Sequence, residues 1–318
     1  MTDPERIGFI GLGVMGWPMA QNVRRRFANI TVYDIVTARR DMAAAAGFDT
    51  ADSLGDLVDR SDIIVSVLPD TPDVEAIVNS PGGVHQARPG TCLIEMSTIS
   101  PTVAAELGTA LETKGVAMVD APVSGGVQKA ESGQLSIMVG GSEGTIERVR
   151  SVLETMGTPV HMGDVGAGQA TKACNQVAVT LTIQAACEAF ALGANLGVDL
   201  GKLRSALLGG SCASWILENM GETILQGDDR PGFRIELQVK DLRIAQETAQ
   251  AASTPLPGLA TVLGLYTEAM ANGFGGAGNQ SLARVYERHT GAAIGKQKFQ
   301  PEAFGSKKDA DKRDTHAT

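Results

Sequence analysis

The sequence has few aromatic residues and no excess of basic residues. Phe, Trp and Tyr make up only 4% of the 318 residues, and 27 lysines and arginines stand against 36 acidic residues. The resulting formal net charge of −9 would repel a phosphate backbone, so we expect no nucleic-acid partner. The hydrophobic content of 43% still allows a substantial core, and the length is sufficient for two domains.

Residues that would bind a metal or form disulfides are equally scarce. The four cysteines are far apart and form no C-x-x-C pair, which argues against a zinc site and a disulfide framework. The four histidines, His85, His161, His289 and His316, show no metal-binding spacing. We therefore expect no metal.

Long apolar runs are also absent. No uninterrupted run reaches the ~18 residues of a membrane span, and no charged and apolar leader opens the chain. We therefore expect a cytoplasmic protein without a membrane partner.

Short apolar runs alternate with amphipathic segments in the first half, a pattern typical of βαβ units and a parallel sheet. The predicted strands are 6–10, 30–33, 63–68, 92–95, 117–120, 135–139 and 159–162. The segment 14–27 is predicted as a helix. Two further helices are predicted where a hydroxyl residue precedes proline, at Thr71-Pro72 and Ser100-Pro101.

The pattern changes near Gly166. Residues 167–195 lack proline and are mostly small or apolar, which predicts one helix roughly 45 Å long at 1.5 Å per residue. The later segments are helical in character: 200–208, 215–225, 237–252, 259–272 and 281–289.

These patterns predict an α/β protein with a Rossmann-type doubly wound parallel sheet in its N-terminal domain, 1–165. An all-α C-terminal domain for substrate binding and oligomerisation, 166–300, is joined to it through the long helix. The charged tail, 301–318, is expected to be disordered.

A glycine-rich turn follows the first predicted strand and opens the first helix. The first glycine of such a turn permits its tight backbone, the second admits a pyrophosphate, and the third allows close helix–strand packing. The residues expected to hold the cofactor here are Gly11, Gly13, Val14, Met15 and Gly16. The alternative is an ordinary glycine turn without a ligand.

Asp34 ends the second predicted strand, where a carboxylate accepts hydrogen bonds from the adenosine ribose. Such a carboxylate repels the 2′-phosphate of NADP, so we predict NAD as the cofactor. Arg39 and Arg40 follow closely and would soften this preference, which leaves NADP as the alternative. The plainer interpretation of these arginines is a pair of solvated charges on the next helix.

Four motifs stand in order: Ile10 to Gly16, Asp120 to Gly126, Gly166 to Asn175, and Lys240-Asp241-Leu242. Together they closely resemble the 3-hydroxyisobutyrate dehydrogenase-like, or β-hydroxyacid dehydrogenase, family. The resemblance extends over about residues 6–288. It implies an NAD-dependent oxidoreductase that transfers a hydride between nicotinamide and a small 3-hydroxy carboxylic acid or its semialdehyde.

Lys172 and Glu188 are the only charged residues between 167 and 195. A lysine on such a helix either extends its ammonium to the surface or is held for chemistry. Burial and a nearby positive ring lower a lysine pKa toward the range of a general base. The resemblance implies that Lys172 exchanges the hydroxyl proton and that Asn175, on the same helix face, orients the substrate. Many family members have a second asparagine where Gln176 stands here, so that contact is not carried over.

Ser124, Gly125 and Gly126 follow another strand, and their hydroxyl and backbone N–H groups could hold a carboxylate. An ordinary turn is the alternative, whereas the resemblance implies the substrate-carboxylate site.

The resemblance implies further contacts on both halves of the chain. Leu68, Pro69 and Thr98 would border the cofactor's ribose and nicotinamide, and Lys240 would close over the cofactor. Asp241 and Phe233 would line the substrate pocket. Without the resemblance, Lys240 and Asp241 would be interpreted as a solvated pair near a helix start.

Several functions remain in competition. A tartronate semialdehyde (2-hydroxy-3-oxopropionate) reductase is a close alternative, and a non-catalytic dinucleotide-binding sensor is an alternative of another class. The second domain is too short for a phosphogluconate dehydrogenase, and Lys172 argues against an imine reductase. The long apolar helix exceeds what one small domain can cover, which favours a homodimer or homotetramer.

Overall fold

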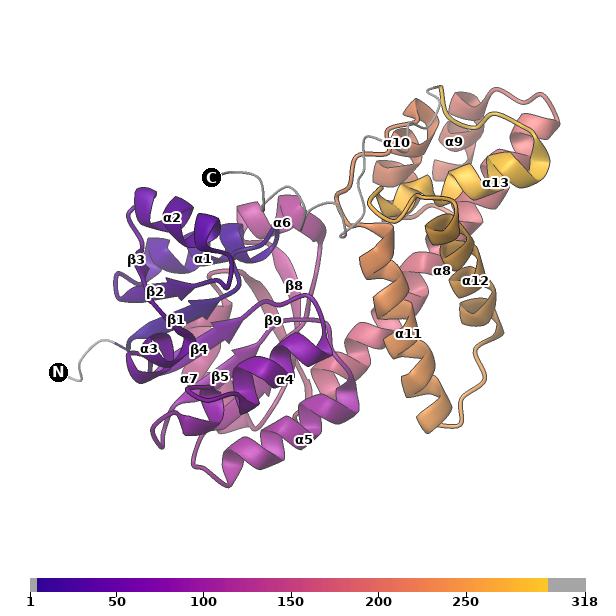
Figure 1. Ribbon diagram of the computed structural model, residues 1–318. Helices are drawn as coiled ribbons and strands as arrows, with labels where there is room; N and C mark the ends of the chain where they lie inside the picture. Colours follow the sequence, from indigo (N-terminus) through magenta and orange to yellow (C-terminus); the bar gives the residue numbers. More distant parts are fainter. Residues whose placement is uncertain (1–4, 297–318) are drawn as a thin grey trace. The chain divides into compact units, whose positions relative to one another are not determined.

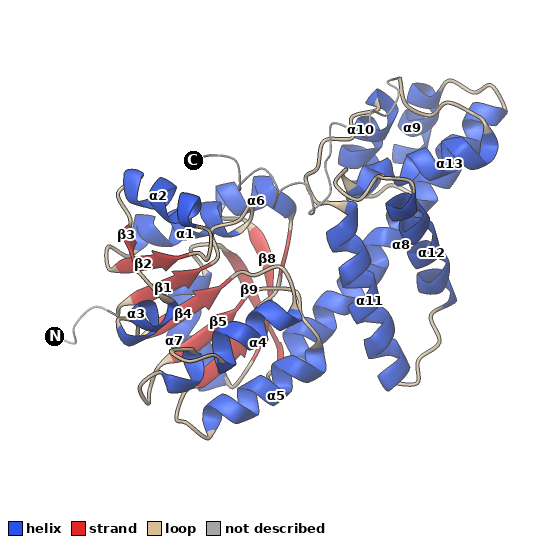
Figure 2. Cartoon of the chain, viewed as in Figure 1, coloured by secondary structure: helices blue, strands red, loops and turns tan. Residues whose placement is uncertain are grey.

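The computed structural model describes residues 5–296, and the chain divides into two compact units, Met1–Lys172 and Ala173–Thr318 (Figure 1). The described strands all belong to the first unit, whereas the second is built from helices (Figure 2). The predicted tail and His316 lie outside the described residues.

The sheet of the first unit contains all seven predicted runs. Its strands are β1 (Ile7–Ile10), β2 (Ile30–Tyr33), β3 (Asp49–Thr50), β4 (Ile63–Ser66), β5 (Cys92–Glu95), β6 (Ala117–Asp120), β7 (Val123–Ser124), β8 (Leu135–Gly140) and β9 (Gly157–Gly163). The order is β3-β2-β1-β4-β5-β6-β8-β7, with β9 beside β8. Strands β1 to β6 pair in parallel, whereas β8 runs antiparallel to β6 and β7. The two-residue strands β3 and β7 were not predicted.

Helices cover both faces of this sheet (Figure 2). They are α1 (Gly16–Arg26), α2 (Thr37–Ala45), α3 (Leu54–Asp59), α4 (Thr71–Asn79), α5 (Pro101–Glu112), α6 (Gly126–Ser132) and α7 (Glu143–Leu153), with a 3₁₀ turn at Val84–Gln86. Successive strand residues face opposite sides. Ile63 and Val65 therefore join the core under α1 and α7, whereas Ile64 joins the core under α3, α4 and α5.

Of the two predicted hydroxyl caps, the one at Thr71 is wrong and the one at Ser100 is confirmed in position. Helix α4 is capped by Asp70, whose carboxylate accepts the backbone N–H of Thr71, so Thr71 is already helical. Ser100 is the N-cap of α5, but its side chain makes no capping hydrogen bond. The proline signal therefore located both helix starts, and it identified the N-cap residue of α5 but not that of α4.

The strand order reverses direction at β1 and β4, because the chain continues from β1 toward β3 and returns to β4 on the other side. In open α/β sheets, ligands bind at the carboxyl ends of the strands beside such a switch point. The glycine-rich turn follows β1 at this edge.

Helix α8 (Ala167–Asn195) has the predicted bounds, and the second unit packs around the part of it that follows Lys172. The other helices are α9 (Leu200–Leu208), α10 (Gly221–Gln226), α11 (Ile235–Ala251), α12 (Pro257–Ala271) and α13 (Ala283–Thr290). A π-helical turn at Ile216–Met220 and a 3₁₀ turn at Asn279–Leu282 replace the first turns of two predicted helices.

Helix α8 is long and apolar enough to cross a membrane by length and composition alone. The core helix of a folded domain has the same character. Ile183, Cys187 and Phe190 of α8 are fully buried and share a core with Tyr266 of α12. The composition of α8 is therefore weak evidence for a membrane span.

We predict that Gly16→Ala destabilises the first unit. A Cβ at Gly16 would lie 1.9 Å from the Gly11 carbonyl oxygen, so the backbone would have to move. Overpacking of this kind costs about 1–3 kcal/mol of unfolding free energy. The matched control is Gly144→Ala in α7, where nothing lies within 4 Å of the added Cβ. Urea denaturation checks both variants, and equal stabilities would show that the turn tolerates a side chain.

Candidate active site

The glycine-rich turn is fixed by two close backbone approaches. Gly11 has φ +94°, and a Cβ there would lie 2.2 Å from the Val67 carbonyl oxygen. Gly16 packs equally closely on Gly11. By contrast, a Cβ at Gly13 would meet only the Arg39 guanidinium, at 3.9 Å. The middle of the turn is therefore open to a ligand.

The start of α1 fits an anion. Its N-cap, Met15, makes no side-chain capping hydrogen bond, and its first turn carries no acidic residue. The first backbone N–H groups of a helix and its dipole then favour a negative group, such as a pyrophosphate. Val14 beside them is 71% exposed, whereas Met15 packs against the core. The residues present fit a dinucleotide.

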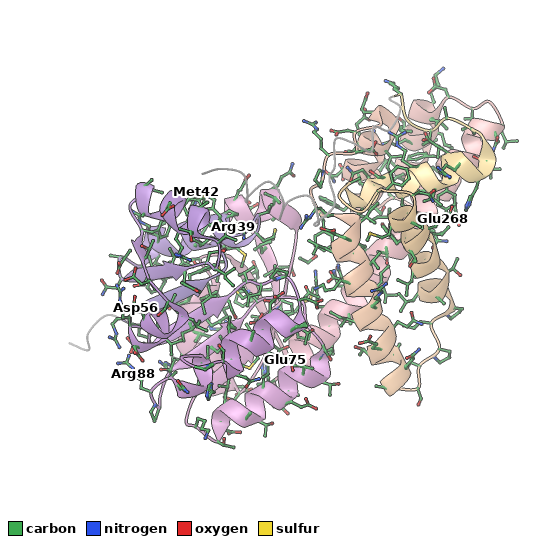
Figure 3. All side chains as sticks on the ribbon, in the orientation of Figure 1. Arg39, Met42, Asp56, Glu75, Arg88 and Glu268 are labelled. Atoms are coloured by element: carbon green, nitrogen blue, oxygen red, sulfur yellow. The ribbon has the colours of Figure 1, made fainter. Side chains whose placement is uncertain are left out.

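Asp34 joins the end of β2 to this turn. Its carboxylate is 4% exposed and accepts the N–H of Leu12 at 2.7 Å and that of Val36 at 2.9 Å. Arg39 of α2, labelled in Figure 3, lies 3.2 Å away through Nη1 and has a half-exposed side chain. Arg40 donates to the Asp34 carbonyl oxygen at 2.6 Å.

As predicted, the two arginines lie on the next helix with partly exposed side chains, but they are more than solvated charges. Both guanidinium groups contact Asp34, and Arg40 also lies over the Tyr33 ring at 5.5 Å. A cation beside Asp34 offsets part of its repulsion of a 2′-phosphate.

Two loops at the same edge of the sheet are joined by one hydrogen bond. The N–H of Leu68, in the loop after β4, donates to the Ser97 hydroxyl of the loop after β5 at 2.7 Å. Pro69 is exposed and Thr98 is half-buried in these loops. The structure thus brings together the two segments that were predicted beside the ribose and nicotinamide.

Lys172 lies beside the serine–glycine turn. Its side chain is buried, with 7% exposure, and Nζ donates to the Val123 carbonyl oxygen at 2.8 Å. Ser124 follows directly in β7. Gly125 and Gly126 have φ of +138° and +71°, which residues with a Cβ rarely adopt. The Lys172 amine and the serine–glycine turn are therefore neighbours.

Asp120, which had no predicted individual role, holds the start of α8. Its carboxylate is fully buried and accepts the N–H groups of Gly166 and Gln169, each at 2.7 Å. Burial raises the pKa of Asp120, and these hydrogen bonds oppose that effect. The sequence signal was its place in the Asp120–Gly126 motif, but its partners are distant along the chain.

In the second unit, four polar side chains form a chain of contacts. Asn175 donates to Gln176 at 2.8 Å, Gln176 donates to Asp241 at 2.6 Å, and Lys240 pairs with Asp241 at 2.8 Å. Gln176 and Asp241 are buried, inside α8 and α11 respectively. The interpretation of Lys240 and Asp241 as a solvated pair is therefore wrong, and Gln176 links Asn175 to both. Phe233, before α11, is half-buried.

Within residues 5–296, no three His, Cys, Asp or Glu side chains are grouped as metal ligands. The described histidines make structural contacts. His85 binds the Val78 carbonyl oxygen, and His289 pairs with Glu268. His161 binds the carbonyl oxygens of two glycines.

Comparisons with known proteins show the family to which the chain belongs. The family model for the NAD-binding domain of 6-phosphogluconate dehydrogenase matches residues 6–190. The model described as NAD-binding of NADP-dependent 3-hydroxyisobutyrate dehydrogenase matches residues 166–286.

Two relatives and one solved structure match nearly the whole chain. A 2-(hydroxymethyl)glutarate dehydrogenase of Eubacterium barkeri is 35% identical over 92% of this chain and 99% of its own. A 2-hydroxy-3-oxopropionate reductase of Escherichia coli (strain K12) is 37% identical over 89% and 97%. The structure of Mycobacterium tuberculosis 3-hydroxyisobutyrate dehydrogenase with L-serine superposes with a TM-score of 0.81 at 30% identity, covering 90% and 99%.

The fold together with these relatives defines an NAD(P)-dependent oxidoreductase that acts on CH–OH groups. The chain belongs to the 3-hydroxyisobutyrate dehydrogenase-like (β-hydroxyacid dehydrogenase) family.

We predict that Asp34→Asn weakens NADH binding by roughly tenfold to a hundredfold, the share of one charge-assisted hydrogen bond. NADPH should lose less, because the variant also loses a charge that opposes the 2′-phosphate. Asp41→Asn, an exposed position on α2, is the charge-matched control. Titration of nicotinamide fluorescence gives the dissociation constants. A wild type that already binds NADPH more tightly would contradict the predicted preference for NAD.

Proposed function

We propose that this protein oxidises the primary alcohol of 2-substituted 3-hydroxypropionates to the aldehyde, with NAD as the preferred cofactor and NADP as an alternative. The contact between Lys172 Nζ and the Val123 carbonyl oxygen, 2.8 Å long and adjacent to Ser124, carries the proposal. This contact places the Lys172 amine at the residue that precedes the Ser124 turn. It therefore supports a role for the amine in moving a proton close to a carboxylate held by that turn.

The compounds after which the relatives are named, and the L-serine bound in the solved structure, support this class. 3-Hydroxyisobutyrate, L-serine and 2-(hydroxymethyl)glutarate all contain a hydroxymethyl group on the carbon that bears the carboxylate. 2-Hydroxy-3-oxopropionate is the corresponding aldehyde with a hydroxyl substituent. These molecules differ in the group at C2, so the common carboxylate and alcohol define the substrate class, and a reductase working in reverse uses the same site.

Each proposed site residue has one task in this reaction. NAD(P), when bound, accepts the hydride from the alcohol carbon. In the oxidative direction, the neutral amine of Lys172 takes the hydroxyl proton, so that the alcohol becomes an aldehyde. In the reductive direction, the ammonium of Lys172 returns this proton to the oxygen. The Ser124 hydroxyl and the N–H groups of Gly125 and Gly126 hold the carboxylate. Asn175, one turn beyond Lys172, orients the substrate.

The cofactor residues follow the same division. We assign the pyrophosphate to the glycine-rich turn, the adenosine ribose to Asp34, and the nicotinamide ribose to the loops of Leu68, Pro69 and Thr98. From the second unit, Lys240 is assigned to the cofactor, and Asp241 and Phe233 to the substrate. Substrate binding and self-association are assigned to the C-terminal domain.

A cytoplasmic homo-oligomer is part of the proposal. Leu192, Leu196 and Val198 are between 44% and 70% exposed at and beyond the end of α8, which leaves apolar surface for a second copy.

A non-catalytic dinucleotide sensor is the alternative of another class. Such a protein has no need for a buried lysine at a substrate turn, yet Lys172, Asn175 and Ser124 are all present. The geometry therefore supports catalysis better.

A panel of acids with different C2 substituents tests the proposed reaction. It contains 3-hydroxyisobutyrate, L-serine, glycerate, 2-(hydroxymethyl)glutarate and unsubstituted 3-hydroxypropionate, each with NAD and with NADP. We expect reduction of the cofactor, measured by absorbance, with at least one member of the panel.

The matched control for each acid is the primary alcohol of the same structure without its carboxylate, which should not react at a comparable concentration.

Ser124→Ala should raise KM for every reactive acid by roughly tenfold to a hundredfold, because the carboxylate is common to all of them. Turnover of no member of the panel with either cofactor would overturn the proposed function.

We predict that Lys172→Ala lowers the rate constant of hydride transfer by ~10²–10⁴-fold, the usual share of a general acid/base. NADH affinity should remain, because the cofactor contacts are assigned elsewhere. Lys172→Arg should restore little, since a guanidinium does not lose its proton near neutral pH. Stopped-flow absorbance with the best acid decides the point. A Lys172→Ala enzyme that keeps more than about a tenth of the rate would assign the proton to another group.

A further inference from the structure

Three buried polar residues have no task in the proposed reaction. Glu95 at the end of β5 is fully buried, and Ser97 and Gln169 are 3% and 1% exposed. Polar groups at such depth destabilise a fold unless they are hydrogen-bonded. Their partners therefore show what they hold in place.

Glu95 holds the ends of two neighbouring strands. Its Oε1 accepts the backbone N–H of Ser97 at 2.6 Å, and its Oε2 accepts the hydroxyl of Ser66, the last residue of β4. The Ser97 hydroxyl in turn accepts the N–H of Leu68 at 2.7 Å. One carboxyl group thus sets both loops that are assigned to the cofactor.

Gln169 extends this chain of contacts to α8. Its amide nitrogen donates to the Ser97 carbonyl oxygen at 2.8 Å, and its amide oxygen accepts the N–H of Ile99 at 3.1 Å. Both contacts flank Thr98. Gln169 stands three residues before Lys172 in the same helix, so the two side chains share a helix face.

We propose that Glu95 and Gln169 are positioning residues, whose hydrogen bonds through Ser97 set the Thr98 loop and Lys172 at a fixed separation. The inference rests on the proposed role of Lys172 as general acid/base. Proton transfer depends steeply on the placement of the base, and a displacement of about 1 Å can cost a hundredfold in rate. Loss of the Gln169 contacts therefore affects the chemical step more than binding.

The ionisation of Glu95 provides a separate measurement. Burial raises the pKa of Glu95 to about 7, and the negative charge of Asp120 on β6 adds to this, whereas the hydrogen bonds from Ser66 and Ser97 oppose it. The unfolded chain loses this proton near its ordinary pKa of 4.5. Between these two pH values the folded protein therefore binds more protons than the unfolded chain. As a result, the contribution of Glu95 lowers the free energy of unfolding as the pH rises from about 4.5 to about 7, and this loss remains at higher pH.

Gln169→Leu tests the link to α8, because leucine has a similar size and makes neither hydrogen bond. We expect kcat with the best acid to fall by about tenfold or more. The KM for the acid and the dissociation constant of NADH, measured by fluorescence, should stay within about twofold. Gln184→Leu is the control, because it removes a glutamine of α8 that binds Glu188 and should leave kcat unchanged.

Gln169→Glu gives a readout that a merely structural role would not produce. The neutral acid can donate to the Ser97 carbonyl oxygen and accept from Ile99, whereas the carboxylate cannot donate. We expect kcat of this variant to approach the wild-type value at low pH and to fall as the pH rises, beyond any fall in the wild type.

Glu95→Gln tests the other end without substrate. Glutamine can accept from the Ser97 N–H and donate to the Ser66 hydroxyl, so the contacts remain while the charge is removed. The difference in Tm between the variant and the wild type should be measured at pH 5 and at pH 8. We expect this difference to shift in favour of the variant by at least about 2 °C between the two. A difference that does not change with pH would overturn the placement of Glu95.

The outcomes separate the two proposals. A wild type that turns over no acid would overturn the proposed function. An active wild type with unchanged kcat in Gln169→Leu would overturn the positioning role alone. If kcat, NADH affinity and Tm all fall together in Gln169→Leu, the positioning role is also overturned, because such a result indicates a general loss of structure.

Discussion

The site depends on the two hydrogen bonds with which Asp120 holds the backbone N–H groups of Gly166 and Gln169. A carboxylate at the first turn of a helix satisfies donors that have no partner within the helix, and it also favours the helix dipole. Here the carboxylate ends β6, so the sheet itself determines where α8 begins. The position of Lys172 then follows from the geometry of the helix, and its amine reaches the Val123 carbonyl oxygen.

Close packing of glycines makes this attachment possible. A Cβ at Gly140 would lie 2.2 Å from an Asp120 carboxylate oxygen, and one at Gly168 would lie 2.4 Å from the Met138 carbonyl oxygen. Helix and sheet therefore meet backbone to backbone one turn before Lys172, the residue proposed to transfer the proton. The low aromatic content is consistent with such packing, because small side chains let backbones approach.

The sequence predicted the parts of the molecule that repeat over several residues. It predicted every strand of four or more residues and the long helix α8, and the motifs also indicated the family. The two-residue strands β3 and β7 have no periodic signal, since their positions depend on pairing with distant strands. The same reason applies to Glu95 and Gln169, whose partners in other elements are not visible in a local pattern. Gln176 looked like a departure from the family, although its side chain bridges Asn175 and Asp241.

The glycine-rich turn has a consequence for the kinetics of cofactor association. Contacts within the chain, from Asp34 to Leu12 and between Gly16 and Gly11, already determine the shape of the turn. If a dinucleotide binds at this turn, as proposed, it meets a formed surface, and little conformational entropy is lost on binding. Association should then proceed as rigid docking, without a slow ordering step. Differences between dinucleotides should consequently appear in how long each remains bound.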